Sequence, residues 1–177
     1  FLVSGVSIAL SLRSRTGGQF TAERIRRLVV PLLVGIFVLS PPQVYLERIG
    51  LGMFEGSFPA YLPHYFDGMY MGVGEPGNFA WMGLHLWYLL MLFVFSALML
   101  PVFQRINRSQ SFTTKLADFI STLFGPYLFI IPLFLMELLV SLSPDTVGRR
   151  DFGGWSPLTY LVFFSIGYLL ATDERYR

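Results

Sequence analysis

The sequence predicts an all-α protein, a polytopic bundle of membrane helices, and three observations support this fold class. Hydrophobic residues make up 54% of the 177 residues and charged residues only 14%, whereas a typical globular chain has about 25% charged residues. Aromatic residues contribute a further signal at 17%, because a soluble domain of this length cannot bury that much apolar surface. The apolar residues also gather in long runs, and about 20 residues at about 1.5 Å each are enough to cross a bilayer.

Four of these runs are long enough for full membrane helices, and a fifth looks like the second half of one. The four runs cover residues 28–46, 84–104, 119–143 and 152–172, and the half helix covers residues 1–12. Prolines within the runs are compatible with helices in lipid. The pair Pro41-Pro42 predicts an end or a sharp bend of the first full helix. We therefore expect one membrane domain over residues 1–177, with about four full helices and part of one more.

The distribution of basic residues predicts the orientation. Ten of the thirteen lysines and arginines fall in residues 13–27, 105–115 and 175–177. If the chain crosses the membrane with the five segments above, these three regions lie on the same side. An excess of basic residues marks the cytoplasmic side of a membrane protein. The segment 47–80 then lies outside. It is rich in glycine, proline and aromatic residues, so we expect it to lie on the membrane face or to fold back as a lid over a cavity.

Three arginines stand where the run 28–46 begins, in the stretch FTAERIRRLVVPLLVGIF. Arg24 and Arg27 are three residues apart, which puts them on one face of a helix, with Arg26 turned away. Paired guanidinium groups match phosphate and carboxylate oxygens, and a helix that begins here adds N–H groups and a dipole that favour an anion. Basic residues also flank cytoplasmic helix ends for topology alone, so the spacing leaves both interpretations open.

Three other titratable side chains are candidates for function. His85 lies at the outer end of its apolar run, next to Trp87 and other aromatic residues. It is either part of an interfacial aromatic belt, or a functional residue that carries a proton or contacts a sugar. His64 lies in the outer segment, as a solvated side chain or a substrate contact. Glu137 is an acid well inside an apolar run, where it is either protonated, paired with another helix or near a wet interface.

Several classes of site are not predicted. The chain has no cysteine and two histidines, so we expect neither thiol chemistry nor a metal site. The motifs of P-loop, dinucleotide-binding, zinc-peptidase and serine-hydrolase sites are absent. The net charge of +2 is concentrated at the predicted membrane edges. We therefore expect contact with membrane lipid and no binding of nucleic acid.

Two patterns resemble a known family. The stretches FLVSGVSIALSLRSRT, FTAERIRRLVVPLLVGIFVLSPPQVYLE and GLHLWYLLMLFVFSALMLP are similar to consecutive parts of the membrane acyltransferase type-3 family. The likeness is closest to its glucan biosynthesis or glucan succinyltransferase branch. The pattern F-x3-R-x2-R-L-x2-P over residues 20–31 and the run H-L-W-Y-L over residues 85–89 carry the resemblance.

The resemblance implies a multi-pass O-acyltransferase of the bacterial cytoplasmic (inner) membrane. Such an enzyme moves an acetyl or succinyl group from cytoplasmic acyl-CoA, without a metal, to a hydroxyl of an extracytoplasmic glycan or lipid-linked sugar. The family's R-x-x-R motif maps onto Arg24 and Arg27, which would bind the donor, and we expect His85 and Trp87 near the chemistry. The family's catalytic histidine is expected on a helix before residue 1. We therefore expect this chain to be a fragment, without the first and the C-terminal helices, that is inactive alone.

Two other functions stay open at this point. A transporter or flippase subunit would use discontinuous helices with polar groups near the membrane midplane, and the prolines in the apolar runs allow such breaks. A non-catalytic membrane scaffold would use the aromatic segment 47–80 as a surface for a partner.

Overall fold

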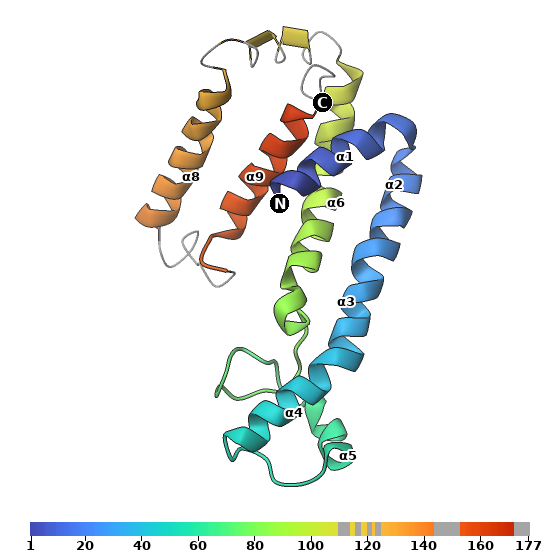
Figure 1. The fold of residues 1–177 in the computed structure, drawn as a ribbon, viewed down its shortest axis with the longest axis vertical. Helices are drawn as coiled ribbons and strands as arrows, with labels where there is room; N and C mark the ends of the chain where they lie inside the picture. Colours follow the sequence, from blue (N-terminus) through green and yellow to red (C-terminus); the bar gives the residue numbers. More distant parts are fainter. Residues whose placement is uncertain (110–113, 116–117, 120–121, 123–124, 144–152, 172–177) are drawn as a thin grey trace. The chain divides into compact units, whose positions relative to one another are not determined.

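The computed structural model describes residues 1–109, 114–115, 118–119, 122, 125–143 and 153–171, and these residues fold as helices and connecting turns (Figure 1). The described ranges contain no strand, and an isolated bridge joins Met69 and Phe79. The all-α prediction is therefore confirmed. The elements, with η for 3-10 and π segments, are α1 Leu2–Ser14, α2 Gly17–Arg24, η1 Ile25–Val29, α3 Val30–Val34, η2 Gly35–Leu39, α4 Ser40–Gly50, α5 Phe58–Tyr61, η3 Leu62–Phe66, η4 Leu84–Leu86, α6 Trp87–Arg108, η5 Pro126–Phe129, α8 Ile130–Leu142 and α9 Pro157–Leu170.

Two helices in the described part of the chain are long and apolar enough to cross a membrane. They are the continuous helix Gly17–Gly50, with 34 residues, and the helix Leu84–Arg108, with 25 residues. They contain the predicted runs 28–46 and 84–104. The other predicted full spans correspond to the shorter apolar helices Tyr127–Leu142 and Pro157–Leu170, while parts of 119–143 and 152–172 lie outside the described residues. Length and composition thus support two of the four full spans.

The first long helix begins earlier than predicted. We expected residues 13–27 to form a basic loop, but the chain turns only at Arg15 and Thr16 before the helix starts at Gly17. Thr16 and Gln19 form a capping box: the Gln19 backbone N–H donates to Thr16 Oγ1 at 3.4 Å, and the Thr16 N–H donates to Gln19 Oε1 at 3.1 Å. This T-x-x-Q pattern satisfies free N–H groups at a helix start, and it is the sequence feature that the prediction missed.

The same helix changes its hydrogen-bond pattern twice, each time just before a proline. The Val30 N–H bonds to Ile25 O and the Ser40 N–H to Gly35 O, so both bonds span five residues. Proline cannot donate to the next position of the ladder. The helix nevertheless continues through Pro41-Pro42 to Gly50, and α4 turns away from the line of α3 (Figure 1). The prolines therefore bend the helix, as one of the two predicted outcomes stated, and do not end it.

A tyrosine hydroxyl compensates for the proline at this bend. In the five-residue pattern Ile36 O would accept from position 41, where Pro41 has no N–H. Tyr65 Oη donates to Ile36 O at 2.8 Å instead, and the Tyr65 side chain is 1% exposed. We expect Tyr65→Phe to lower the free energy of unfolding by about 1–3 kcal/mol, because the buried carbonyl loses its donor. Denaturation of the full-length protein in detergent measures this, and the exposed Tyr88→Phe is the matched control; equal stability of the two variants would contradict the assignment.

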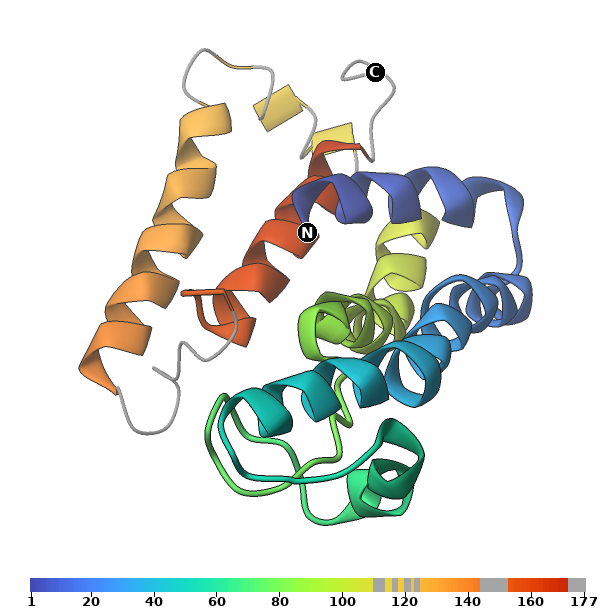
Figure 2. The ribbon, with the colours of Figure 1, turned by 60° about the horizontal axis from the view of Figure 1, so that its bottom comes forward.

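The described residues fall into two compact units, Phe1–Glu23 with Val94–Arg177, and Arg24–Phe93. In the first unit α1 crosses α9 at close range (Figures 1 and 2). A buried small-x3-small pair lies on each side of the crossing, Gly5 with Ala9 in α1, and Gly167 of α9 with Ala171 directly after it. A Cβ at Gly5 would lie 2.0 Å from Phe164 O, and one at Gly167 would lie 2.0 Å from Leu2 O. Small residues at such spacing let membrane helices approach backbone to backbone.

This crossing makes a second stability prediction. We expect Gly5→Ala to lower the free energy of unfolding by about 1–3 kcal/mol, because the new methyl group meets backbone atoms that cannot move aside alone. Gly18→Ala in α2 is the matched control, since no atom lies within 4 Å of the position that its new Cβ would take, and it should be neutral or stabilise by up to about 1 kcal/mol. Thermal unfolding of both variants compares them, and an unchanged midpoint for Gly5→Ala would refute the close crossing.

A buried tyrosine joins α6 to α9 in the same unit. The Tyr168 ring stacks on Phe103 with centroids 3.6 Å apart, and its hydroxyl lies 3.0 Å from Phe103 O and 2.7 Å from Asn107 Oδ1. At the same C-terminal end of α9, an Arg13 guanidinium nitrogen donates to Ala171 O at 3.4 Å. A basic side chain at the last carbonyls of α9 is favoured by the helix dipole. Polar contacts therefore fix helices whose surfaces are otherwise apolar.

In the second unit, residues 47–80 form what we call the aromatic cap. Its buried centre consists of Val44 of α4 with Tyr61, Tyr65 and Ala80. Further rings and side chains pack around this centre, namely Tyr45, Phe54, Phe58, Tyr70, Phe79 and Leu84. The short helices α5 and η3 lie beside α4 (Figure 2). The segment that was expected to be an outer loop therefore packs on itself and on α4, and α4 itself extends into it as far as Gly50.

Candidate functional site

The two arginines of the R-x-x-R motif lie inside the first long helix, in its first third. Arg24 is the last residue of α2 and is half-buried, whereas Arg27 lies in η1 and is exposed. Because the helix begins at Gly17, the free N–H groups of a helix start are about two turns away from Arg24. The predicted contribution of a helix N-terminus to anion binding at this motif is therefore wrong, and the guanidinium groups alone remain for that role.

The π segment η1 also changes the geometry of the pair. Its bonds span five residues rather than four, so it has more residues per turn than the 3.6 of an α-helix. Arg24 and Arg27 are therefore spread further round the axis than α spacing predicts. Segments of this kind are rare and frequently occur at functional sites. The neighbouring Arg26 is exposed as well, so two of the three arginine side chains lie at the surface of the helix.

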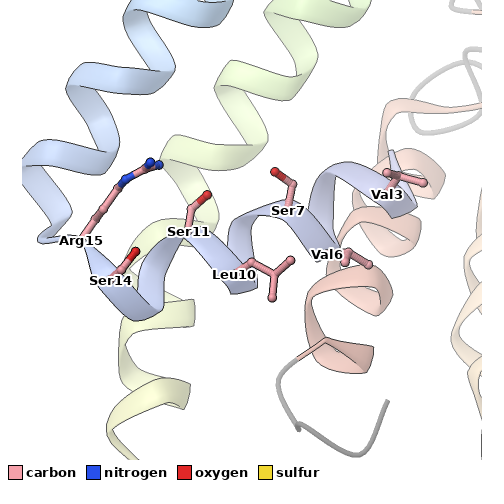
Figure 3. Close-up of a pocket in the computed structure, with 7 residues that line it drawn as sticks. All are labelled: Val3, Val6, Ser7, Leu10, Ser11, Ser14 and Arg15. Carbon is pink, nitrogen blue, oxygen red and sulfur yellow. The ribbon is translucent and has the colours of Figure 1, made fainter. Parts of the chain in front are cut away.

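A shallow pocket of about 410 Å³ runs along α1, next to this basic segment in the sequence. Ser7, Ser11 and Arg15 project from the same side of the helix, as their spacing of four residues requires (Figure 3). Arg15 forms an ion pair with Glu23, which compensates its charge. The pocket therefore combines serine hydroxyls and a neutralised cation with the apolar side chains of Val3, Val6 and Leu10.

His85 and Trp87 lie at the entrance to the second long helix. His85 is exposed in η4, and Trp87 is the half-buried first residue of α6. Residues two apart on a helix do not face each other, so the structure does not bring these two side chains onto one face. The preceding Leu84 has φ of 53°, a left-handed conformation that costs a branched residue about 1–2 kcal/mol. Such strain tends to gather at functional sites, which is consistent with a role for His85.

The remaining candidates of the sequence have defined neighbours. The His64 Nδ1 lies 2.9 Å from Asp67 Oδ2, and both side chains are exposed in the aromatic cap. Glu137 of α8 is half-buried, and its Oε2 accepts a 3.4 Å hydrogen bond from Thr159 Oγ1 of α9. Among the described residues, no group of three histidine, aspartate or glutamate side chains could hold a metal ion.

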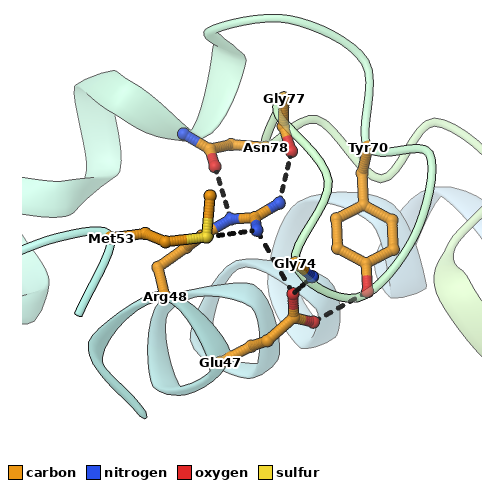
Figure 4. Close-up of polar contacts among 7 residues, drawn as sticks. All are labelled: Glu47, Arg48, Met53, Tyr70, Gly74, Gly77 and Asn78. Carbon is orange, nitrogen blue, oxygen red and sulfur yellow. Dashed lines mark hydrogen bonds and ion pairs between the residues drawn. The ribbon is translucent and has the colours of Figure 1, made fainter. Parts of the chain in front are cut away.

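Arg48 is a candidate functional residue that the sequence did not reveal. It is 2% exposed, and Figure 4 shows its guanidinium in the middle of a group of polar contacts. Its Nε donates to Asn78 Oδ1 at 3.0 Å, one terminal nitrogen donates to Gly77 O at 2.7 Å, and the other lies 3.3 Å from Glu47 Oε1. Glu47 in turn accepts a 2.7 Å hydrogen bond from the Tyr70 hydroxyl. This network ties the end of α4 to residues 70–78.

A signal for this network was present in the sequence. Glu47 and Arg48 are adjacent charges directly after an apolar run, and an aromatic segment follows them. Charged residues are almost never fully buried unless they are paired. Both residues fall in the segment 47–80 that is expected outside the membrane, and sequence alone does not indicate that residues 77–78 return to α4.

These features define a helical protein with apolar helices long enough for a membrane, a basic segment inside one of them and a polar network in the cap. The profile of the acyltransferase domain family Acyl_transf_3 matches residues 1–177. The chain belongs to this family, whose members are membrane proteins. No curated protein and no solved structure gives a significant match. The acyltransferase family predicted from the two motifs is thus confirmed, whereas its glucan succinyltransferase branch stays a prediction.

Proposed function

We propose that this chain is part of a membrane O-acyltransferase that takes an acyl group from cytoplasmic acyl-CoA and transfers it to a hydroxyl of an extracytoplasmic glycan or lipid-linked sugar. The match of the acyltransferase domain to all 177 residues carries the proposal. The two long apolar helices support a membrane setting. Placement in a bacterial inner membrane and a role in glucan modification are further parts of the proposal.

The acyl donor binds, in this proposal, at Arg24 and Arg27. Acyl-CoA carries several phosphate groups, and guanidinium groups bind phosphate through paired, charge-assisted hydrogen bonds. Arg27 is exposed and Arg24 half-buried, so one can meet soluble donor while the other anchors it at the helix. The accumulation of basic residues in 13–27 and 105–115 favours the cytoplasmic face for this end of the helix by the positive-inside rule.

The reaction needs a base, a hydroxyl and a thioester held in one geometry. The base removes the proton of the sugar hydroxyl, the oxygen attacks the thioester carbonyl, and the C–S bond breaks to release coenzyme A as the thiol. In this proposal a histidine supplies the base, and His85 and Trp87 lie near the chemistry. Most of the rate enhancement then comes from positioning and from proton transfer, with no metal required.

Transfer of label from donor to glycan tests the proposal. Membrane vesicles that contain the full-length protein are given acetyl-CoA or succinyl-CoA labelled in the acyl group. We expect label on the glycan, in a form released by mild alkaline hydroxylamine as an ester is. Glycan that crosses the bilayer without label would favour a transporter, and the absence of both transfer and transport would favour a scaffold.

A further inference from the structure

The aromatic cap contains a cavity of its own. Its volume is about 350 Å³, within the range of small-molecule sites. The lining includes Arg48, Phe54, Tyr61, His64, Asp67 and Asn78. All of these residues belong to the cap or its junction with α4, so this unit alone builds the cavity.

One polar group in the cavity lining has no partner in the described structure. Tyr61 is 0% exposed, and its hydroxyl makes no hydrogen bond to any described residue. The rings of Phe54 and Tyr45 pack against it, with centroids 5.2 Å and 5.5 Å away. Burial raises the pKa of Tyr61 to about 12, so the hydroxyl keeps its proton at neutral pH. A buried hydroxyl without a partner costs stability, and in native proteins such a group usually has a partner, either protein, ordered water or a bound molecule.

The other polar groups indicate what kind of molecule fits. The Arg48 guanidinium is occupied by Asn78, Gly77 and Glu47, and Asn78 Nδ2 donates to His64 O at 2.8 Å. The positive charge of Arg48 is therefore balanced within the protein, so the cavity does not require an anionic ligand. His64 is oriented by Asp67 through Nδ1, which leaves its Nε2 available. With the Tyr61 hydroxyl, these groups can exchange hydrogen bonds with the hydroxyls of a neutral molecule.

We infer that this cavity binds a pyranose ring of a neutral glycan, with hydroxyls bonded to Tyr61 Oη and the His64–Asp67 pair and with the ring against Phe54. The aromatic ring supplies an apolar face and the polar groups fix the orientation, as in other small-molecule sites. The inference rests on the proposed function, in which the acceptor is an extracytoplasmic sugar. It identifies the cap as the place where the acceptor sugar is held.

Saturation-transfer NMR with methyl β-D-glucopyranoside tests the site. The full-length protein is placed in lipid nanodiscs free of sugar detergents, and succinate serves as an anionic probe. We expect saturation transfer to the glucoside but not to succinate, and a loss of affinity of about tenfold in Tyr61→Phe, the effect of one buried hydroxyl bond. Tyr88→Phe, at an exposed position outside the cavity, should bind the glucoside as the wild type does.

Stability separates this role from a structural one. Because Tyr61 Oη bonds to no described residue, Tyr61→Phe should leave the unfolding midpoint unchanged or raise it. A lowered midpoint, an unchanged affinity in Tyr61→Phe, or no transfer to the glucoside in the wild type would each overturn the inference. Acyl transfer without glucoside binding would refute the sugar site but not the proposed reaction. Glucoside binding without acyl transfer would refute the proposed reaction but not the sugar site.

Discussion

Replacing both Arg24 and Arg27 with alanine is expected to lower kcat/KM for acyl-CoA by roughly 10²–10⁴-fold. Each hydrogen-bonded contact with a charged group contributes about 1.5–3 kcal/mol, and about 1.4 kcal/mol corresponds to a factor of ten. The range is broad because neighbouring sites are not additive. Initial rates of acyl transfer at varied acyl-CoA concentration, in vesicles with equal amounts of each variant, measure the change.

Two controls make this experiment specific. Arg26→Ala removes an exposed arginine of the same segment and should keep kcat/KM within about threefold, because only general attraction to the donor is lost. The double lysine variant at Arg24 and Arg27 keeps both charges but loses the paired geometry, so it should fall between wild type and the alanine variant. Equal rates for wild type and the double lysine variant would show that charge alone matters at this helix.

Replacing Arg48 with methionine is expected to unfold the aromatic cap. The change leaves Glu47 Oε1, Asn78 Oδ1 and Gly77 O without their guanidinium partner. Removing one member of a buried charged pair costs about 3–5 kcal/mol, which is a large share of the stability of a whole domain. Hydrogen exchange of the full-length protein should therefore rise sharply over residues 51–80.

The matched control for Arg48 is Arg105→Met, since Arg105 is exposed in α6. It should leave exchange in the cap unchanged. Acyl transfer should also fall in Arg48→Met, because the proposed acceptor site loses its framework. Protection of residues 51–80 equal to that of the wild type would mean that the aromatic contacts hold the cap without the ionic network.

Helix type and the two longest helices followed from the sequence, because apolar composition and run length dominate in a membrane setting. The predicted ends of the helices were less accurate than their type. The capping box at Thr16 and Gln19 makes the first long helix begin earlier in the sequence than predicted. Hydrogen bonds that span five residues let the same helix continue past Pro41-Pro42. Both are local hydrogen-bond arrangements, which a count of apolar residues does not register.

The candidate site was predictable where a motif marked it and not where it depends on distant contacts. The motifs mark Arg24, Arg27 and His85 in the sequence, and their roles stay predictions. Arg48 and Tyr61 are not marked, because their importance depends on residues 77–78 and on a cavity that forms only when the cap closes. Contacts between side chains about 30 residues apart in an irregular segment leave no hydrophobic periodicity in the sequence, so they could not be predicted from it.

The sidedness of the basic segment and the cap is the most direct test of the central claim. The 177 residues contain no cysteine, so single cysteines can be introduced at Arg26 and Glu75, which are both exposed, in a cysteine-free full-length protein. A membrane-impermeant maleimide is then applied to intact and to permeabilised spheroplasts. We predict that Glu75→Cys reacts in intact spheroplasts and that Arg26→Cys reacts only after permeabilisation. Reaction of Arg26→Cys in intact spheroplasts would place the arginines on the outside and contradict their binding of cytoplasmic acyl-CoA.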